Sequence, residues 1–355
     1  MKYKKYTALV VGGNGIIGRN LTKHLSCQSN WNVMVTSRSS LHYETNATFI
    51  ALDLNKANSL EQYHQKLQEV THIFYAAYTE KQDPYEQTEA NLLLLKNLVF
   101  GIEKIANQLQ RILFIQGGKA YGAHLGFYKT PALETDLRSI TPNFYYDQED
   151  FLKEASRGSH WKWTAIRPDI VMGFTVKNPM NMVNLLAVYA SICKEENIPM
   201  RFPGSIKAYQ ILANVTHTDI LCKAMQWAAE HAETENEIFN ITNGDVFRWS
   251  ELWPKIGTFF GVAVAEPQTF SLREYMPGKS KLWKTMIKKY NLKPYDLEAL
   301  VQWGFGDFIF NVETDAFQDV NKARRFGFHE MNGNTEAKLM ETFKELQLEK
   351  IIPTF

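Results

Sequence analysis

The sequence predicts an α/β fold: a doubly wound parallel sheet, with a smaller, mainly helical region toward the C-terminus. Three observations support this. A β-rich run, Ala8–Val11, ends in the glycines Gly12, Gly15 and Gly18 and continues as an apolar, helix-compatible run. Short apolar runs then alternate with helical stretches, the pattern of a parallel sheet with helices on both faces. Beyond about Gly173, the chain becomes helical and rich in Met, Leu and aromatic residues.

Composition limits the classes of protein that fit. The chain has 355 residues, is 45% hydrophobic and 22% charged, and carries a net charge of +1. This charge gives no field that favours nucleic acid or an anionic membrane, so we expect neither partner. The apolar run Leu92–Phe100 is too short to span a bilayer. The three cysteines fit reduced core thiols of a cytoplasmic protein, and the histidines lack the spacing of a metal site.

Each glycine of the first turn has a physical role. Gly12 lets the chain turn sharply out of a strand, Gly15 lets backbone N–H groups approach a pyrophosphate, and Gly18 lets the helix pack close to the sheet. The free N–H groups of the helix N-terminus then favour phosphate. The stretch therefore indicates a dinucleotide site; the alternative is a tight glycine turn without a ligand.

The carboxyl ends of parallel strands share one edge, where ligands of such sheets bind. We expect further strands at Asn32–Thr36, Thr48–Leu52, His72–Tyr78, Arg111–Gln116, Trp163–Arg167 and Phe239–Thr242, and a long helix at Asn91–Ile105. Strand ends therefore bring the glycine turn, Arg38, Ala76–Tyr78 and Lys119 to the same edge.

The second strand ends in Ser37-Arg38-Ser39-Ser40, where an Asp or Glu would select NADH. A guanidinium beside hydroxyls suits a 2′-phosphate, so we expect NADPH; the alternative is an exposed loop arginine. Asp53 follows the third strand. It fits equally an acceptor for the adenine amino group and a cap of the next helix.

The usual reductase pair on this kind of fold is a Tyr with a Lys four residues later, on the same helix face. Here the residues four after Tyr145 and Tyr146 are Glu149 and Asp150, so the pair is absent. Gly117-Gly118 stands where a Ser or Thr usually follows the fifth strand. The next residue in this loop is Lys119.

These features resemble the progesterone 5β-reductase and iridoid synthase-like enone reductases, an atypical branch of the extended short-chain dehydrogenases/reductases (SDRs). The matching pieces are GGNGIIG at 12–18, SR at 37–38, GGKAYG at 117–122, NFYYDQED at 143–150, RPDIVMG at 167–173, NPMNMVNLLAVYASICK at 178–194, FNITNGDVFRW at 239–249 and WGFGD at 303–307. The resemblance extends to at least Phe328, and the NFYY and GGK elements are its specific parts.

The resemblance implies a Rossmann fold of extended SDR type and the NADPH-dependent reduction of a C=C bond conjugated to a carbonyl. It implies that Tyr145 is the catalytic tyrosine and that Lys119, from a loop, replaces the helical lysine. The substrate is then a small-molecule enone. We expect its pocket to include Tyr78, Tyr146, Met180 and Phe305. Dimers are common in this superfamily, so a homodimer is an expectation that no particular residue supports.

The expected cofactor contacts lie at the strand ends and at the glycine turn. They are Gly12, Asn14, Gly15, Ile16, Ile17, Gly18, Ser37, Arg38, Ser39, Asp53, Leu54, Ala76, Ala77, Gln116, Gly117, Tyr145, Pro168, Ile170 and Val171. We expect the dinucleotide-binding domain to span 1–175, with 206–245 returning to it. A substrate-binding or lid region then comprises 176–205 and 246–355.

Two other functions fit the same fold. One is an SDR carbonyl reductase or sugar-nucleotide epimerase; the missing Ser/Thr and helical Lys count against it. The other is a non-catalytic NADP(H)-binding regulator, and such proteins usually lose the catalytic tyrosine. The presence of both Tyr145 and Lys119 favours an enzyme.

Overall fold

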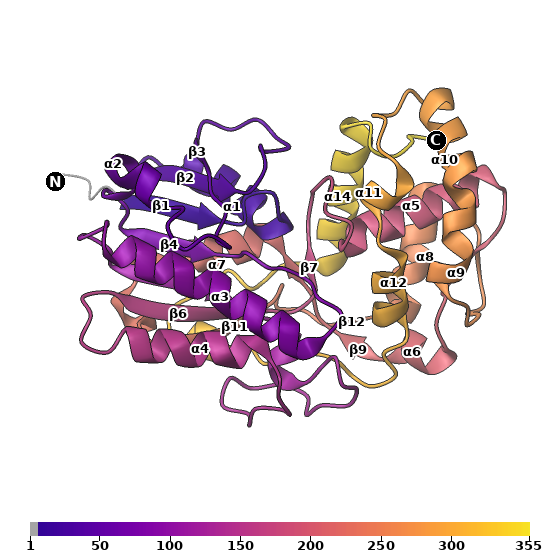
Figure 1. Cartoon of the computed structure of the whole chain (residues 1–355). Helices are drawn as coiled ribbons and strands as arrows, with labels where there is room; N and C mark the ends of the chain where they lie inside the picture. Colours follow the sequence, from indigo (N-terminus) through magenta and orange to yellow (C-terminus); the bar gives the residue numbers. More distant parts are fainter. Residues whose placement is uncertain (1–5) are drawn as a thin grey trace. The chain divides into compact units, whose positions relative to one another are not determined.

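The computed structural model describes residues 6–355, and the chain divides into two units. Unit 1 consists of the chain up to Asp169 together with Thr218–Ile241 and Asp319–Glu330. Unit 2 consists of Ile170–His217, Thr242–Gln318 and Met331–Phe355. Figure 1 colours the chain by residue number, so the segments of each unit can be followed along it.

These bounds differ from the expected ones. Segments 170–175, 206–217 and 242–245 belong to unit 2, and 319–330 belongs to unit 1. The last segment returns because helix α13 (Asn321–Arg325) lies on the outermost strand of the sheet. There Lys322 pairs with Glu237 at 2.6 Å, and the rings of Phe326 and Phe239 lie 5.2 Å apart. Composition alone gives no sign of such a short return.

Unit 1 contains, within residues 6–355, one seven-stranded sheet of order β11-β6-β5-β4-β1-β2-β3, and every pair is parallel. The strands are β1 (Tyr6–Val11), β2 (Trp31–Ser37), β3 (Thr48–Ala51), β4 (His72–Tyr75), β5 (Arg111–Ile115), β6 (Lys162–Pro168) and β11 (Glu237–Ile241). The predicted doubly wound parallel sheet is thus confirmed.

Helices cover the sheet in two layers. The helical elements of unit 1 are α1 (Ile16–Ser26), η1 (Glu61–Tyr63), α2 (His64–Leu67), α3 (Pro84–Glu103), η2 (Gly118–Tyr121), α4 (Phe144–Ala155), α7 (Thr218–Glu230), η3 (Ala232–Thr234) and α13. Helices α3 and α4 lie side by side (Figure 1), and α1 packs against α7. Leu9 and Val11, alternate residues of β1, share a buried cluster with Leu95 and Leu98 of α3 and Leu152 of α4. This is the alternation that a strand buried between two helical layers requires.

Strand β4 ends at Tyr75, three residues earlier than predicted. The Ala76 amide still bonds to Val11 O at 3.0 Å, but a Cβ at Gly12 would lie only 2.8 Å from Ala76 O. The chain therefore leaves the sheet where it meets the glycine turn. Ala76, Ala77 and Tyr78 form a loop instead of a strand end.

Unit 2 is mainly helical, as predicted. Its elements are β7 (Val171–Met172), α5 (Met182–Glu195), β8 (Met200–Arg201), α6 (Ile206–Gln210), β9 (Leu212–Ala213), β10 (Thr216–His217), β12 (Phe247–Arg248), α8 (Trp249–Phe260), β13 (Val264–Ala265), α9 (Leu272–Tyr275), η4 (Met276–Lys279), α10 (Ser280–Lys289), α11 (Leu297–Leu300), α12 (Trp303–Phe310) and α14 (Thr335–Leu348). Its central helix, α5, is buried on all sides from Met182 to Cys193.

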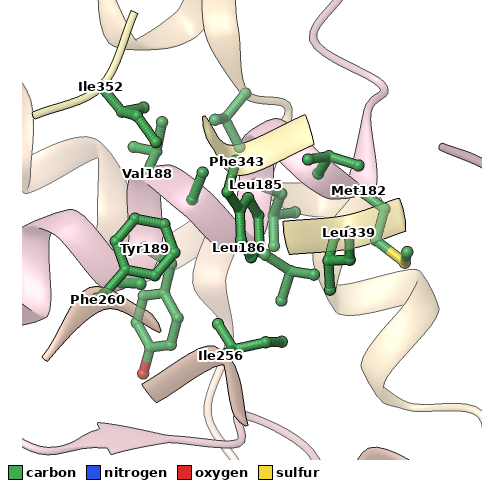
Figure 2. Close-up of a cluster of buried hydrophobic side chains, with 14 of the residues drawn as sticks. Met182, Leu185, Leu186, Val188, Tyr189, Ile256, Phe260, Leu339, Phe343 and Ile352 are labelled. Atoms are coloured by element: carbon green, nitrogen blue, oxygen red, sulfur yellow. The ribbon is translucent and has the colours of Figure 1, made fainter. Parts of the chain in front are cut away.

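Figure 2 shows how α5 is packed. Leu186 and Tyr189 of α5 lie among side chains from α8 and α14, such as Phe260 and Phe343, and Ile352 adds a contact from the chain end. Asn181 begins the helix because its Oδ1 accepts from the Val183 amide at 2.9 Å. The core of unit 2 is thus formed by apolar side chains that pack closely around α5.

Expectations from the sequence also concern the cysteines, possible metal ligands and possible membrane-spanning helices. Cys193 and Cys222 are buried as expected, but Cys27 is exposed at the C-cap of α1. In the part of the chain that the structure describes, no three His, Cys, Asp or Glu side chains gather as a metal site would require. Among those same residues, no helix combines the length and the apolarity needed to cross a bilayer.

Candidate active site

The glycine turn between β1 and α1 forms a cradle of backbone groups. Gly12 has φ +95°, which other residues rarely adopt, and a Cβ at Gly18 would lie 2.3 Å from Gly12 O. Helix α1 begins at Ile16 after the N-cap Gly15, and no side chain caps its first N–H groups. These groups remain available to an anion, so the turn fits the pyrophosphate of a dinucleotide.

The loop after β2 is fastened to this turn by Asn14. Its Nδ2 donates to Ser37 Oγ at 2.9 Å, to Ser40 O at 3.1 Å and to Ser39 Oγ at 3.3 Å, and its Oδ1 accepts from the His42 amide at 3.1 Å. Two further contacts hold the same loop over the turn. The Tyr43 hydroxyl donates to Gly13 O at 3.0 Å, and Arg19 lies 5.2 Å from the Tyr43 ring.

Other expected cofactor contacts lie along the same strand ends. A Cβ at Gly12 would lie 2.8 Å from Ala76 O and 3.0 Å from the Ala77 nitrogen, so these two residues pass close to the turn. Asp53 Oδ1 accepts from the Asn55 amide and side chain, which lower the pKa of its carboxyl; it closes a turn and caps no helix. Leu54 is buried, and its carbonyl accepts from Asn97.

The last three expected cofactor contacts divide between the units. Pro168 ends β6 in unit 1, whereas Ile170 and Val171 belong to unit 2.

Tyr145 lies in the first turn of α4. Asn143 caps this helix, with Oδ1 accepting from the Tyr145 amide at 3.1 Å. The Tyr145 hydroxyl would lie 3.3 Å from a Cβ at Gly117, so a glycine there leaves room for it. Burial raises the pKa of Tyr145 well above its usual value, and the neighbouring Tyr78 adds to the rise. The phenol therefore stays protonated over the ordinary pH range.

Lys119 lies in the 3₁₀ helix η2, directly after β5. Its carbonyl accepts from the Gly122 amide at 3.1 Å and from Asn143 Nδ2 at 2.8 Å. Burial lowers the pKa of its ammonium, which Glu80 partly offsets. Within residues 6–355 this ammonium makes no hydrogen bond or ion pair, so it is available to a bound ligand.

Glu149 stands where the usual helical lysine would be, and it is tied into a buried ion network. Its side chain is 3% exposed, with Oε2 accepting from Arg167 at 3.1 Å and Gln116 at 3.0 Å. Its Oε1 accepts from Lys153 at 2.6 Å and Arg138 at 3.0 Å. Burial alone would raise the pKa of this carboxyl, but these donors together lower it to about 2. Glu149 is therefore an anionic anchor of α4.

Gln116 joins this network to the tyrosine. Its Nε2 also donates to Tyr145 O at 3.1 Å, and its Oε1 accepts from Arg167 Nε at 2.5 Å. Arg167 reaches the Tyr121 hydroxyl as well, at 3.2 Å. The backbone of Tyr145 is thus held from the side of β5 and β6.

The expected pocket residues differ in their surroundings. Tyr78 is 38% exposed, and its hydroxyl accepts from Gln87 at 3.1 Å. Its ring lies 5.6 Å from Phe144, which lies 4.3 Å from Tyr145. Burial, with Glu80, raises the pKa of Tyr78 to about 12.

Tyr146 is only 2% exposed, and Met180 and Phe305 are half-buried in unit 2. The Gln302 amide donates to Pro179 O at 2.9 Å, which joins the segments that carry Met180 and Phe305.

Sequence reasoning missed three residues of this arrangement: Asn143, Arg167 and the structural role of Glu149. Two signals were present. An arginine within an otherwise apolar strand, WTAIRP, needs a buried anion, and Glu149 was the unexplained acid. Asn143 directly precedes a helix, which is the position of an N-cap.

A family model described as a PRISE-like Rossmann-fold domain matches residues 51–353. A 3-oxo-Delta(4,5)-steroid 5-beta-reductase from Arabidopsis thaliana is 32% identical over 337 residues, covering 90% of this chain and 87% of that protein. An (S)-8-oxocitronellyl enol synthase from Nepeta cataria is 31% identical over 373 residues, covering 100% and 94%.

Solved structures with a similar fold are more distant in sequence. A UDP-glucose 4-epimerase from Thermotoga maritima with UDP-glucose has a TM-score of 0.68 at 19% identity, covering 96% of this chain and 99% of that one. A dTDP-glucose 4,6-dehydratase from Bacillus anthracis in complex with NAD has a TM-score of 0.67 at 14% identity, covering 98% of each chain. At these identities the likeness shows the fold alone.

Proposed function

Because the chain belongs to the PRISE-like Rossmann-fold family, we propose that it is an NADPH-dependent reductase of α,β-unsaturated carbonyl compounds. The names of its relatives point the same way: a 3-oxo-Δ4,5 steroid carries a C=C bond conjugated to a carbonyl. NADPH, held at the glycine turn and the strand ends, would supply a hydride to the β-carbon of the enone. The negative charge that develops then appears on the carbonyl oxygen.

The observation that carries the proposal is that Tyr145 is a neutral phenol with no lysine four residues later on its helix. Classical SDR chemistry uses a nearby lysine on the same helix to lower the pKa of its tyrosine. Here Glu149 occupies that position and is committed to Arg167 and its other partners, while burial raises the pKa of Tyr145. A phenol that stays neutral is suited to donate a hydrogen bond and poorly suited to act as a base. This fits a tyrosine that stabilises an enolate by donating a hydrogen bond, and it counts against the base that an epimerase needs.

Lys119 adds favourable potential at the same oxygen. Its ammonium makes no hydrogen bond or ion pair within residues 6–355, and its desolvation strengthens any interaction with a developing anion. We propose that the Tyr145 hydroxyl and the Lys119 ammonium together stabilise the enolate, whose α-carbon then takes a proton from water. In unit 1, Tyr78 is a proposed substrate contact.

The test is turnover with a panel of enones, from 2-cyclohexen-1-one to a 4-ene-3-ketosteroid. NADPH oxidation is followed with the wild type and with Tyr145→Phe, and products are identified by mass spectrometry and NMR. We expect a saturated ketone and a loss of about a hundredfold in kcat in the variant, the usual effect of removing one such donor.

The matched control is Tyr85→Phe, an exposed tyrosine at the start of α3, which should keep full activity. Turnover to an allylic alcohol would favour a carbonyl reductase. Tight NADPH binding without turnover of any enone would favour the regulator.

A further inference from the structure

The loop that carries Lys119 and the first turn of α4 are fastened together by side chains. Asn143 Nδ2 donates to Lys119 O, and the Tyr146 hydroxyl donates to Ala120 O; both distances are 2.8 Å. In the other direction, Gln116 Nε2 donates to Tyr145 O at 3.1 Å. Successive carbonyls of the loop are thus held by residues on either side of Tyr145.

Asn143 contacts the backbone of both proposed catalytic residues. Its Oδ1 accepts from the Tyr145 amide and its Nδ2 donates to the Lys119 carbonyl. One partner can only donate and the other can only accept, so the orientation of the amide is fixed. The side chain is buried, which removes competition from water.

The hydroxyl of Tyr146 also has its hydrogen bonds filled by backbone groups. Its hydroxyl donates its proton to Ala120 O and accepts from the Ser139 amide at 2.7 Å. With 2% of its surface exposed, this side chain has no free group to offer a substrate. This differs from its expected place in the substrate pocket.

We propose that Asn143 and Tyr146 are positioning residues that hold the Lys119 ammonium in a fixed position relative to the Tyr145 hydroxyl. The inference rests on the proposed function of Tyr145 and Lys119. When a Tyr and a Lys share one helix face, the helix itself sets their separation. Here the two come from different elements, so hydrogen bonds between those elements must supply the precision that catalysis requires.

Two substitutions separate this role from helix capping. Asn143→Asp keeps the acceptor for the Tyr145 amide but has no donor for Lys119 O. Asn143→Ser keeps a capping oxygen without adding charge, and it is too short to reach both partners. Asp and Ser cap helices as well as Asn does, so α4 should remain folded in both variants.

The matched control is Asn334→Asp. Asn334 is an exposed N-cap of α14 in unit 2, where its Oδ1 accepts from the Ala337 amide. This substitution changes an N-cap in the same way without touching the Lys119 loop. It should leave kcat unchanged.

The kinetic test is a double-mutant cycle with Lys119→Met. We expect each Asn143 variant to lower kcat about tenfold, the effect of one lost hydrogen bond, with KM and the NADPH dissociation constant changed less than about twofold. In the Lys119→Met background the same variants should cost less than about twofold, because Asn143 acts through Lys119. Tyr146→Phe should behave in the same way.

Hydrogen exchange gives a readout that needs no turnover. In the Asn143 variants, amides of residues 117–122 should exchange faster than in the wild type, while those of 145–155 keep their protection.

The outcomes distinguish this inference from the proposed function. Equal losses of kcat in the wild-type and Lys119→Met backgrounds, or unchanged exchange at 117–122, would overturn the positioning role while leaving enone reduction intact. Wild-type enzyme that forms no saturated product would instead overturn the proposed function, and the exchange result would still decide whether Asn143 holds the loop.

Discussion

The two ends of the proposed cofactor edge in unit 1 each depend on an asparagine, but their surroundings differ. Asn143 is buried and caps the helix that carries Glu149, the buried partner of Arg167. Asn14 is half-buried and fastens a loop in which Arg38, Ser39 and Ser40 are exposed. Changes at the Tyr145 end should therefore cost stability as well as rate. Changes at the Arg38 end should alter cofactor preference while the fold is kept.

The largest effect should come from Glu149→Gln. The variant leaves Arg167 without its buried anion, and removing one partner of such a pair costs about 3 kcal/mol or more. The direction with pH follows from the lowered pKa of about 2. The unfolded chain binds more protons in the acid range, so the wild type loses this contribution as the pH falls from about 5 to about 2.

Chemical denaturation checks this in two ways. The gap in unfolding free energy between wild type and variant should be large near pH 7 and small near pH 2. Glu154→Gln is the matched control on the same helix, because the pair Arg157–Glu154 is exposed and should contribute less than about 1 kcal/mol. A gap that is constant with pH would contradict an anionic Glu149.

Arg38→Ala should weaken NADPH binding about tenfold or more and leave NADH binding nearly unchanged. A charged hydrogen bond to the 2′-phosphate is lost, and NADH has no such group. Calorimetric titration with both cofactors measures this, and thermal unfolding of the free protein should not change. Equal weakening for both cofactors would mean that Arg38 contributes nothing to selection.

Asn14→Ala should have a smaller effect of the same kind. It removes the bonds that hold Ser37 and Ser40 but leaves Arg38 in place, so we expect NADPH affinity to fall about fivefold. The unfolding free energy should change by less than about 1 kcal/mol. A large loss of stability here would contradict the contrast between the two ends.

The smallest effect should come from Gly117→Ala. The new Cβ would lie 3.3 Å from the Tyr145 hydroxyl, so that hydroxyl must shift slightly, and kcat should fall about threefold. Gly278→Ala, where a Cβ meets nothing within 4 Å, is the control. A kcat of Gly117→Ala equal to that of the wild type would show that the hydroxyl has room to spare.

The sequence predicted the parts of this molecule that depend on local patterns. Alternating strands and helices gave the parallel sheet, and glycine spacing gave the turn at Gly12. An arginine within an apolar strand signals the need for a buried anion, but which acid meets that need follows only from the tertiary structure, which pairs Arg167 with Glu149. The bridge from Asn143 to Lys119 joins residues that are 24 apart and likewise follows only from the tertiary structure.

Unit 2 was harder to predict for a different reason. Helix α5 is buried all round, so its sequence lacks the apolar periodicity that normally sets helix bounds. The return of 319–330 to unit 1 depends on tertiary contacts such as the ion pair of Lys322 with Glu237. The sequence of a short helix does not predict such contacts. The resemblance to a known family identified the motifs, but only the structure shows where their side chains lie.

The central claim concerns which carbon receives the hydride, and isotope transfer tests it most directly. Wild-type enzyme is given an enone with NADPH that carries deuterium on the transferable C4 position, and the product is examined by NMR. The account predicts a saturated ketone with deuterium on the former β-carbon. Deuterium on the carbinol carbon of an allylic alcohol would contradict it and establish a carbonyl reductase.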